Sequence, residues 1–124
     1  MFFSRPAGEK YFTRDSVDDY DFQIGDLIND NDWHELALKD VTSKKPALVL
    51  FALNVITTTL SDVAWFRQKG SVGKNQELSV RVEVTGTGHI QSFAIAPDKN
   101  GIIEYNLLTG DWTLFDMSIY GGFK

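Results

Sequence analysis

The sequence predicts an all-β fold of the sandwich or barrel type, and three observations support this prediction. About seven or eight short segments carry strand patterns, and turns rich in glycine, asparagine and aspartate separate them. One of these segments, 78–85, alternates between apolar and polar residues, as a strand with one buried face does. No stretch shows a convincing helical period, and the short connections favour antiparallel pairing of the strands.

The size and the charge of the chain narrow its class. At 124 residues it is expected to form one domain. Its formal net charge of -5 argues against nucleic acid as the main partner, because phosphate binding needs a basic face. The absence of cysteine rules out a disulfide framework and a thiolate zinc site, and suits a reducing cytosol. No apolar run reaches the roughly 18 residues that cross a bilayer, and residues 1–6 lack the apolar core of a signal peptide, so no membrane insertion is expected.

Residues 1–30 are predicted to form an extended N-terminal arm, and residues 31–124 the β domain. Aromatic residues are scattered through the arm among charges, with neither a helical nor a strand period. Such a segment either wraps over its own domain or docks on another protein, since exposed aromatics are favoured anchors at interfaces. The candidate partner-binding residues are Phe2, Phe3, Tyr11 and Phe12.

An acidic cluster inside the arm is predicted to be a solvated face. Its members are Asp15, Asp18, Asp19 and Asp21. Calcium binding is the alternative, but the cluster lacks the spacing and the glycine of a known calcium loop. We therefore expect no metal and no other cofactor.

The first strand of the domain is predicted over residues 33–38, after a turn at residues 29–32. Asparagine and aspartate in the turn hydrogen-bond their own backbone and tolerate left-handed conformations. Leu36 and Leu38 share one side of the strand, opposite Glu35.

Residues 47–56 form the longest apolar run and are predicted to be the central strand. The run is apolar in both parities and is broken only by Asn54. A helix would fit the run alone, but Pro46 before it and the β-branched residues 55–59 at its end favour a strand. Because both sides are apolar, we expect cover over both faces, with a neighbouring sheet, a subunit or a loop over the second.

The remaining strands follow in order, and residues 78–85 carry the clearest pattern. The expected core positions in that segment are Leu78, Val80, Val82 and Val84. The expected exposed positions are Ser79, Arg81, Glu83 and Thr85. A glycine-rich turn at residues 86–88 and an Asn-Gly hairpin signal at residues 100–101 reverse the chain. The other predicted strands are 63–67, 90–96, 102–108 and 112–120.

Sequence motifs for catalysis are weak. The two histidines, His34 and His89, have no cysteine beside them and no second ligand at a metal-binding spacing. His34 and Glu35 are adjacent in a strand, where neighbouring side chains point to opposite faces, so they form no pre-set dyad. Residues 70–74 lack the full spacing of a phosphate loop. A carboxylate pair that meets only in space stays open, but we expect a non-enzymatic protein.

Aromatic side chains offer carbohydrate binding as a further possibility. An exposed Trp65, Trp112 or Tyr105 could stack on a pyranose ring. The competing interpretation places these rings in the core, where they bury a large apolar area. Trp33 and Phe66 are expected in the core, and Trp112 stays undecided between the two. The candidate sugar-binding residues are Trp112 and Tyr105.

Four motifs, in this order and spacing, resemble one known kind of module. They are Asp-Trp-His-Glu-Leu-Ala-Leu at 32–38, Phe-Arg-Gln-Lys-Gly at 66–70, Gly-Ile-Ile-Glu-Tyr at 101–105 and Met-Ser-Ile-Tyr-Gly-Gly-Phe at 117–123. Together they resemble a small jelly-roll-like β-sandwich of tailed-bacteriophage virion proteins, found in tail fibres, head fibres and capsid decorations. The resemblance covers residues 32–124.

The resemblance implies a non-enzymatic virion structural protein that acts through protein–protein contacts. It would be a capsid decoration, a head-fibre protein or a tail-associated component, located in the virion and assembled in the host cytoplasm. The alternative is a carbohydrate- or receptor-binding adhesion module. The implied partners are other virion proteins and, in the alternative, a cell-surface glycan. The doubly apolar central strand and the surplus aromatics further suggest a homo-oligomer, and the analogy with fibre and decoration proteins suggests a trimer.

Overall fold

A computed structural model describes residues 11–13, 20–38, 42, 47–60, 62–70, 78–108 and 112–123. Its elements, in chain order, are β1 (Tyr11–Thr13), β2 (Phe22–Gln23), the 3-10 helix η1 (Ile24–Asp26), β3 (Trp33–Ala37), β4 (Leu48–Thr57), β5 (Val63–Gln68), β6 (Leu78–Arg81), β7 (His89–Ile95), β8 (Ile102–Leu107) and β9 (Trp112–Phe123). Apart from the short η1, every one of these elements is a β-strand, as predicted.

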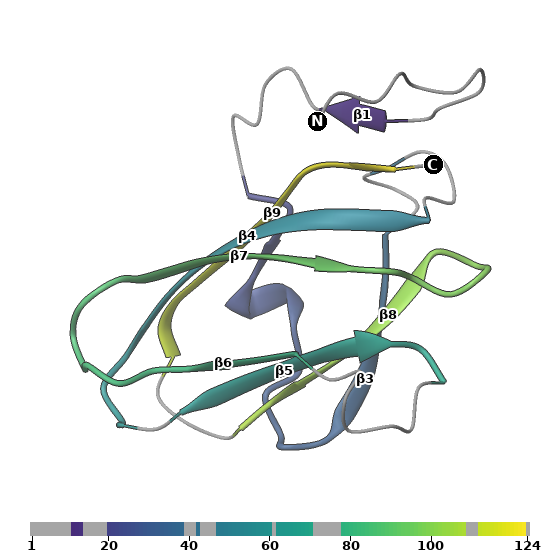
Figure 1. Ribbon diagram of the computed structural model, residues 1–124. Helices are drawn as coiled ribbons and strands as arrows, with labels where there is room; N and C mark the ends of the chain where they lie inside the picture. Colours follow the sequence, from purple (N-terminus) through teal and green to yellow (C-terminus); the bar gives the residue numbers. More distant parts are fainter. Residues whose placement is uncertain are drawn as a thin grey trace.

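The strands form two antiparallel sheets that face each other (Figure 1). Sheet A has the order β1-β9-β4-β7, with β2 also paired to β9, and sheet B has the order β3-β8-β5-β6. Taken from β2 onward, the two orders are β2-β9-β4-β7 and β3-β8-β5-β6, which is the strand arrangement of a jelly roll. The predicted antiparallel sandwich is confirmed.

Strand β4 is the centre of sheet A, as its apolar run predicts. It pairs with β9 on one side and with β7 on the other. Its odd-numbered side chains, Val49 to Val55, are buried between the sheets. Its even-numbered side chains lie on the outer face of sheet A and are half-buried, so the outer face has partial cover rather than the full cover expected.

Aromatic rings join the two sheets in the core. Phe93 of sheet A stacks on Phe51 of the same sheet, with ring centroids 5.1 Å apart, and on Phe66 of sheet B, at 5.0 Å. Offset-stacked rings at such distances add about 0.5–1.5 kcal/mol to the gain from their buried area. Phe66 is thus a core residue, as expected.

The pattern of residues 78–85 is confirmed up to Glu83 and wrong at its end. Val80 and Val82 are buried, and Arg81 and Glu83 are exposed. Val84, expected in the core, is 62% exposed. Strand β6 ends at Arg81, and the chain then turns through Gly86, whose φ is +73°. The alternation therefore continues in the sequence beyond the point where the strand stops.

Residues 20–30 of the predicted arm wrap over the domain itself, which was the first of the two alternatives, and they complete the sandwich. Phe22, Ile24 and Leu27 pack against the core cluster. Strand β2 is fixed to β9 by the amide of Asp21, which donates to the Met117 carbonyl at 3.0 Å, and by the Ile119 amide, which donates to Asp21 Oδ2 at 2.7 Å.

The expectation of a solvated acidic face is wrong for Asp21, which is half-buried and accepts a backbone hydrogen bond. The other members of the cluster, Asp15, Asp18 and Asp19, lie outside the described residues.

Candidate functional site

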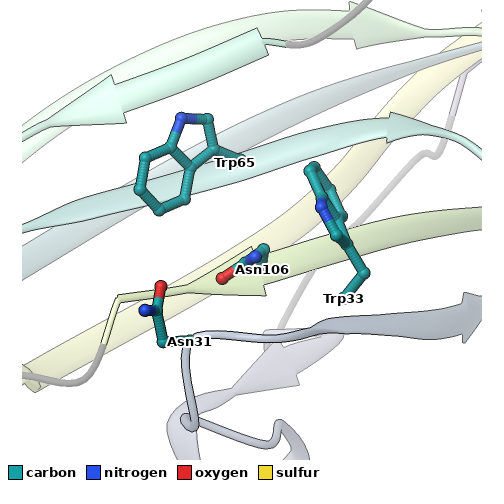
Figure 2. Close-up of a pocket in the computed structure, with 4 residues that line it drawn as sticks. All are labelled: Asn31, Trp33, Trp65 and Asn106. Carbon is teal, nitrogen blue, oxygen red and sulfur yellow. The ribbon is translucent and has the colours of Figure 1, made fainter. Parts of the chain in front are cut away.

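A hollow of about 270 Å³ lies on the outer face of sheet B. Its walls are two tryptophans and its polar groups are two asparagines: Asn31, Trp33, Trp65 and Asn106. Figure 2 shows both indoles standing up from their strands, with the two amides between and below them. The combination of aromatic walls with a few convergent polar groups is typical of small-molecule sites.

The register of sheet B creates this arrangement. Trp33 of β3 lies opposite Asn106 of β8, and Asn106 lies opposite Trp65 of β5. Residues directly opposite each other project from the same face, so the three side chains form one row across the strands. Because β3 and β5 flank β8, the backbones that carry the two indoles are about 10 Å apart.

Asn31 enters the hollow from the turn before β3. Its backbone is left-handed, with φ at 63°, a conformation that asparagine adopts more readily than most residues. The backbone N–H of Asn31 donates to the Leu107 carbonyl at 2.9 Å, and this bond holds the turn against the end of β8. The turn predicted at residues 29–32 thus positions one of the two amides.

Asn106 contributes an acceptor that has no partner. Its Oδ1 atom is buried and receives no hydrogen bond from the residues that the structure describes. A buried acceptor left without a donor costs about 1–3 kcal/mol. Because Oδ1 is buried, a ligand hydroxyl or amide N–H in the hollow can remove this penalty only when the Asn106 side chain turns to expose the atom.

The next row of sheet B fixes one of the indoles. The guanidinium carbon of Arg67 lies 3.7 Å from the centroid of the Trp33 ring system. Arg67 Nε also donates to Glu104 Oε1 at 2.9 Å. A guanidinium held in this way supports the aromatic ring by a cation–π contact, so one face of Trp33 is covered by Arg67.

Carboxylates in that row are paired with cations. Glu104 pairs with Arg67, and Glu35 pairs with Lys69, whose Nζ is 2.7 Å from Glu35 Oε2. The hydrogen bond that Lys69 donates to Glu35, reinforced by the charge of that carboxylate, raises the pKa of Lys69. The row beside the hollow is thus polar but locally neutralised.

The predicted sugar-stacking residues are not at this hollow. Tyr105 is 3% exposed, and its hydroxyl oxygen accepts the Ile28 amide at 2.9 Å. Trp112 is 7% exposed, donates from Nε1 to the Leu108 carbonyl and packs edge-on against Phe115. Neither ring presents a free face to solvent, so the prediction for both is corrected. Both belong to the core.

Trp33 is also corrected, since it was expected in the core and instead forms a wall of the hollow. The sequence contained the signal, because Trp33 has the opposite parity to the buried Leu36 and Leu38. Asn106 likewise lies between the buried Tyr105 and Leu107 in β8, so its side chain points to the outer face.

The partner-binding prediction falls mostly outside the described residues. Phe2 and Phe3 are not described. Tyr11 and Phe12 form β1, and their backbones pair with Phe123 and Gly122 of β9. The proposed contact of these four residues with a partner stays a prediction.

The histidines have partners of their own. His34 Nε2 is 2.7 Å from Asp30 Oδ1, while Glu35 pairs with Lys69. His89 Nε2 lies 3.4 Å from Gln91 Oε1. Among the described residues, no three or more histidines and acids gather in a way that could hold a metal ion.

The chain matches no family model, no curated protein and no solved structure. Within the described part, no helix is long and apolar enough to span a bilayer. The hollow is therefore interpreted from its own chemistry.

Proposed function

We propose that this protein is a non-enzymatic adhesion module that binds carbohydrate in the hollow between Trp33 and Trp65. The observation that supports this proposal is the row formed by two indoles and the unpaired acceptor of Asn106. A pyranose ring has apolar C–H faces that pack on an indole and a rim of hydroxyls that satisfy an amide. The row therefore matches both surfaces of a sugar.

The charges around the hollow favour an uncharged sugar. The unpaired atom of Asn106 is an acceptor, so it needs a donor from the ligand and repels a carboxylate. The cations in the next row, Arg67 and Lys69, are engaged by Glu104 and Glu35. The formal net charge of -5 adds a long-range repulsion of acidic sugars. Neutral hexosides and N-acetylhexosamines are the expected ligands, and sialic and uronic acids are not.

A glycan titration tests this proposal. Neutral, N-acetylated and acidic oligosaccharides are titrated while tryptophan fluorescence and amide chemical shifts are recorded. Trp65→Ala should weaken binding of the preferred neutral glycan by about two- to tenfold, since one stacking contact of about 0.5–1.5 kcal/mol is lost. Tyr120→Ala is the matched control, because Tyr120 is an exposed aromatic on sheet A. Affinity that Trp65→Ala leaves unchanged, or the absence of binding to every glycan in the panel, would contradict the proposal.

A second candidate function, a structural component of a tailed-bacteriophage virion, is compatible with the first. It is favoured by the resemblance of residues 32–124 and by the large apolar side chains left exposed. These are Ile28, Leu60, Val84, Ile90 and the aromatic residues Tyr20, Tyr120 and Phe123. Such side chains contribute to contacts between proteins where they lie together in one patch. An adhesion module attached to a particle would need both a ligand site and such contacts.

Mass spectrometry of purified particles tests the second candidate. The chain should be present in a fixed ratio to the major capsid protein, and antibody labelling in the electron microscope should locate it on the head or on the tail. A chain found only in the unassembled fraction of the lysate would contradict a virion role. This result would leave the glycan proposal standing.

A further inference from the structure

Among the described residues, strand β7 is the last strand on one side of sheet A. Its seven residues, His89–Ile95, pair with β4 along their whole length. Along the described chain, no other strand or backbone group hydrogen-bonds to the opposite edge of β7. A free edge presents a row of unpaired N–H and C=O groups to any strand that can align with it.

The usual protections of an edge strand are missing from β7. It contains no lysine, arginine, aspartate, glutamate or proline. Its register with β4 runs from Val49 opposite Ile95 to Val55 opposite His89 without a bulge. Ile90, which points outward, is 76% exposed. Charges, prolines and bulges are what prevent edge-to-edge association in natural sheets.

The two edge strands of sheet B differ in this respect. Strand β6 has four residues and ends in the exposed Arg81. Strand β3 carries Glu35, which is tied to Lys69 of the β5 end. Short length and charge protect these two edges, and β7 has neither.

We propose that β7 pairs with β7 of a second copy of this chain, in antiparallel fashion about a two-fold axis. The strand is self-complementary in this arrangement: a pairing centred on Ser92 places Ile90 of one copy opposite Ala94 of the other, both on the exposed outer face. The product is a dimer in which the two A sheets become one continuous sheet. This arrangement replaces the trimer suggested by analogy.

Charge also selects β7 as the contact between copies. Two chains that each carry a formal charge of -5 repel one another. Strand β7 has no carboxylate, so pairing there brings no like charges face to face. The remaining long-range repulsion is screened by salt, so the dimer should become tighter as the salt concentration rises.

Sedimentation equilibrium over a range of protein and salt concentrations tests the proposal. The wild-type chain should show a monomer–dimer equilibrium that shifts toward the dimer at high salt. Ile90→Lys and Ser92→Lys, at outward and exposed positions, should each weaken the dimer by about tenfold or more. Each variant lowers the net negative charge, so a weaker dimer must result from the blocked edge and not from general repulsion.

Leu60→Lys is the matched control, because it makes the same kind of change at an exposed position in the turn between β4 and β5. It should leave the dimer intact, and circular dichroism should show the same fold for all variants. A monomer under every condition, a trimer, or a dimer unaffected by both β7 variants would overturn the proposal. Trp65→Ala should not change the association, so this result is independent of the glycan proposal.

Discussion

In the proposed binding site, Asn106 sets stability against ligand binding. Its buried, unpaired Oδ1 atom is unfavourable in the free protein and useful only when a ligand donates to it. Replacing the amide by an isosteric apolar side chain should therefore separate stability from function.

We predict that Asn106→Leu raises the free energy of unfolding by up to about 1–3 kcal/mol, because the folded protein no longer buries an acceptor without a partner. The same change should abolish glycan binding, because the ligand loses the acceptor for its hydroxyl. Thermal unfolding and the glycan titration measure the two effects. Asn54→Leu is the control: Asn54 Oδ1 is also buried and unpaired among the described residues, but it lies on sheet A. That variant should gain stability and keep its binding. Loss of stability in Asn106→Leu would show that the amide has a structural role.

Two neighbouring residues test the register of sheet B. Val82 is fully buried and Glu83 is exposed. Val82→Asp should destabilise the fold by about 3–5 kcal/mol, since it leaves an unpaired charge in the core. Glu83→Lys should change stability by about 0.5 kcal/mol or less. Chemical denaturation measures both, and equal midpoints for the two variants would contradict the register.

At the scale of the elements, residues 20–30 are part of the sandwich. Strand β2 has only two residues and no detectable period, so the sequence pattern could not predict it. It exists because Asp21 accepts the Ile119 amide and because the side chain of Gln23 donates from Nε2 to Asp116 Oδ1 at 2.8 Å. These contacts join positions more than ninety residues apart in the sequence.

A pair of truncations tests the role of β2. A chain that begins at Tyr20 should keep a cooperative thermal transition, whereas a chain that begins at Asn31 should be clearly less stable. The second truncation removes Phe22, Ile24 and Leu27 from the core, each a loss of about 1–2 kcal/mol at partial burial. Equal melting temperatures for the two truncated chains would show that β2 and η1 add nothing to the domain.

The strands that alternation predicts and those that it misses differ in a physical way. Alternation is local, so it correctly placed Val80 and Val82 in the core. It failed at Val84 because the last backbone hydrogen bond on this side is the one from the Val82 amide to the carbonyl of Asp62, and alternation does not show where such pairing ends. The hollow has the same origin. Trp33 and Trp65 lie on either side of Asn106 only because β3 and β5 both pair with β8 in this register. The sequence of one strand does not determine its register with a distant strand.

At the scale of the whole molecule, the proposed dimer determines how the two proposed binding sites are oriented. An antiparallel pair of identical edge strands has its two-fold axis perpendicular to the sheet. The outer faces of the two B sheets then lie on the same side of the dimer. Because each outer face of sheet B carries one hollow, both hollows would face a single surface.

A dimer of this form should bind a glycan-coated surface more tightly than a soluble glycan. We predict that the wild-type chain binds a densely coated surface up to about 10²–10⁴-fold more tightly than Ile90→Lys does, because the second hollow binds intramolecularly once the first is occupied. For the same glycan free in solution, the two proteins should have equal affinities, since Ile90 is on sheet A and away from the hollow. Surface plasmon resonance at high and low glycan density measures the difference. An advantage that persists at low density, or one that is missing at high density, would show that the two hollows do not act together.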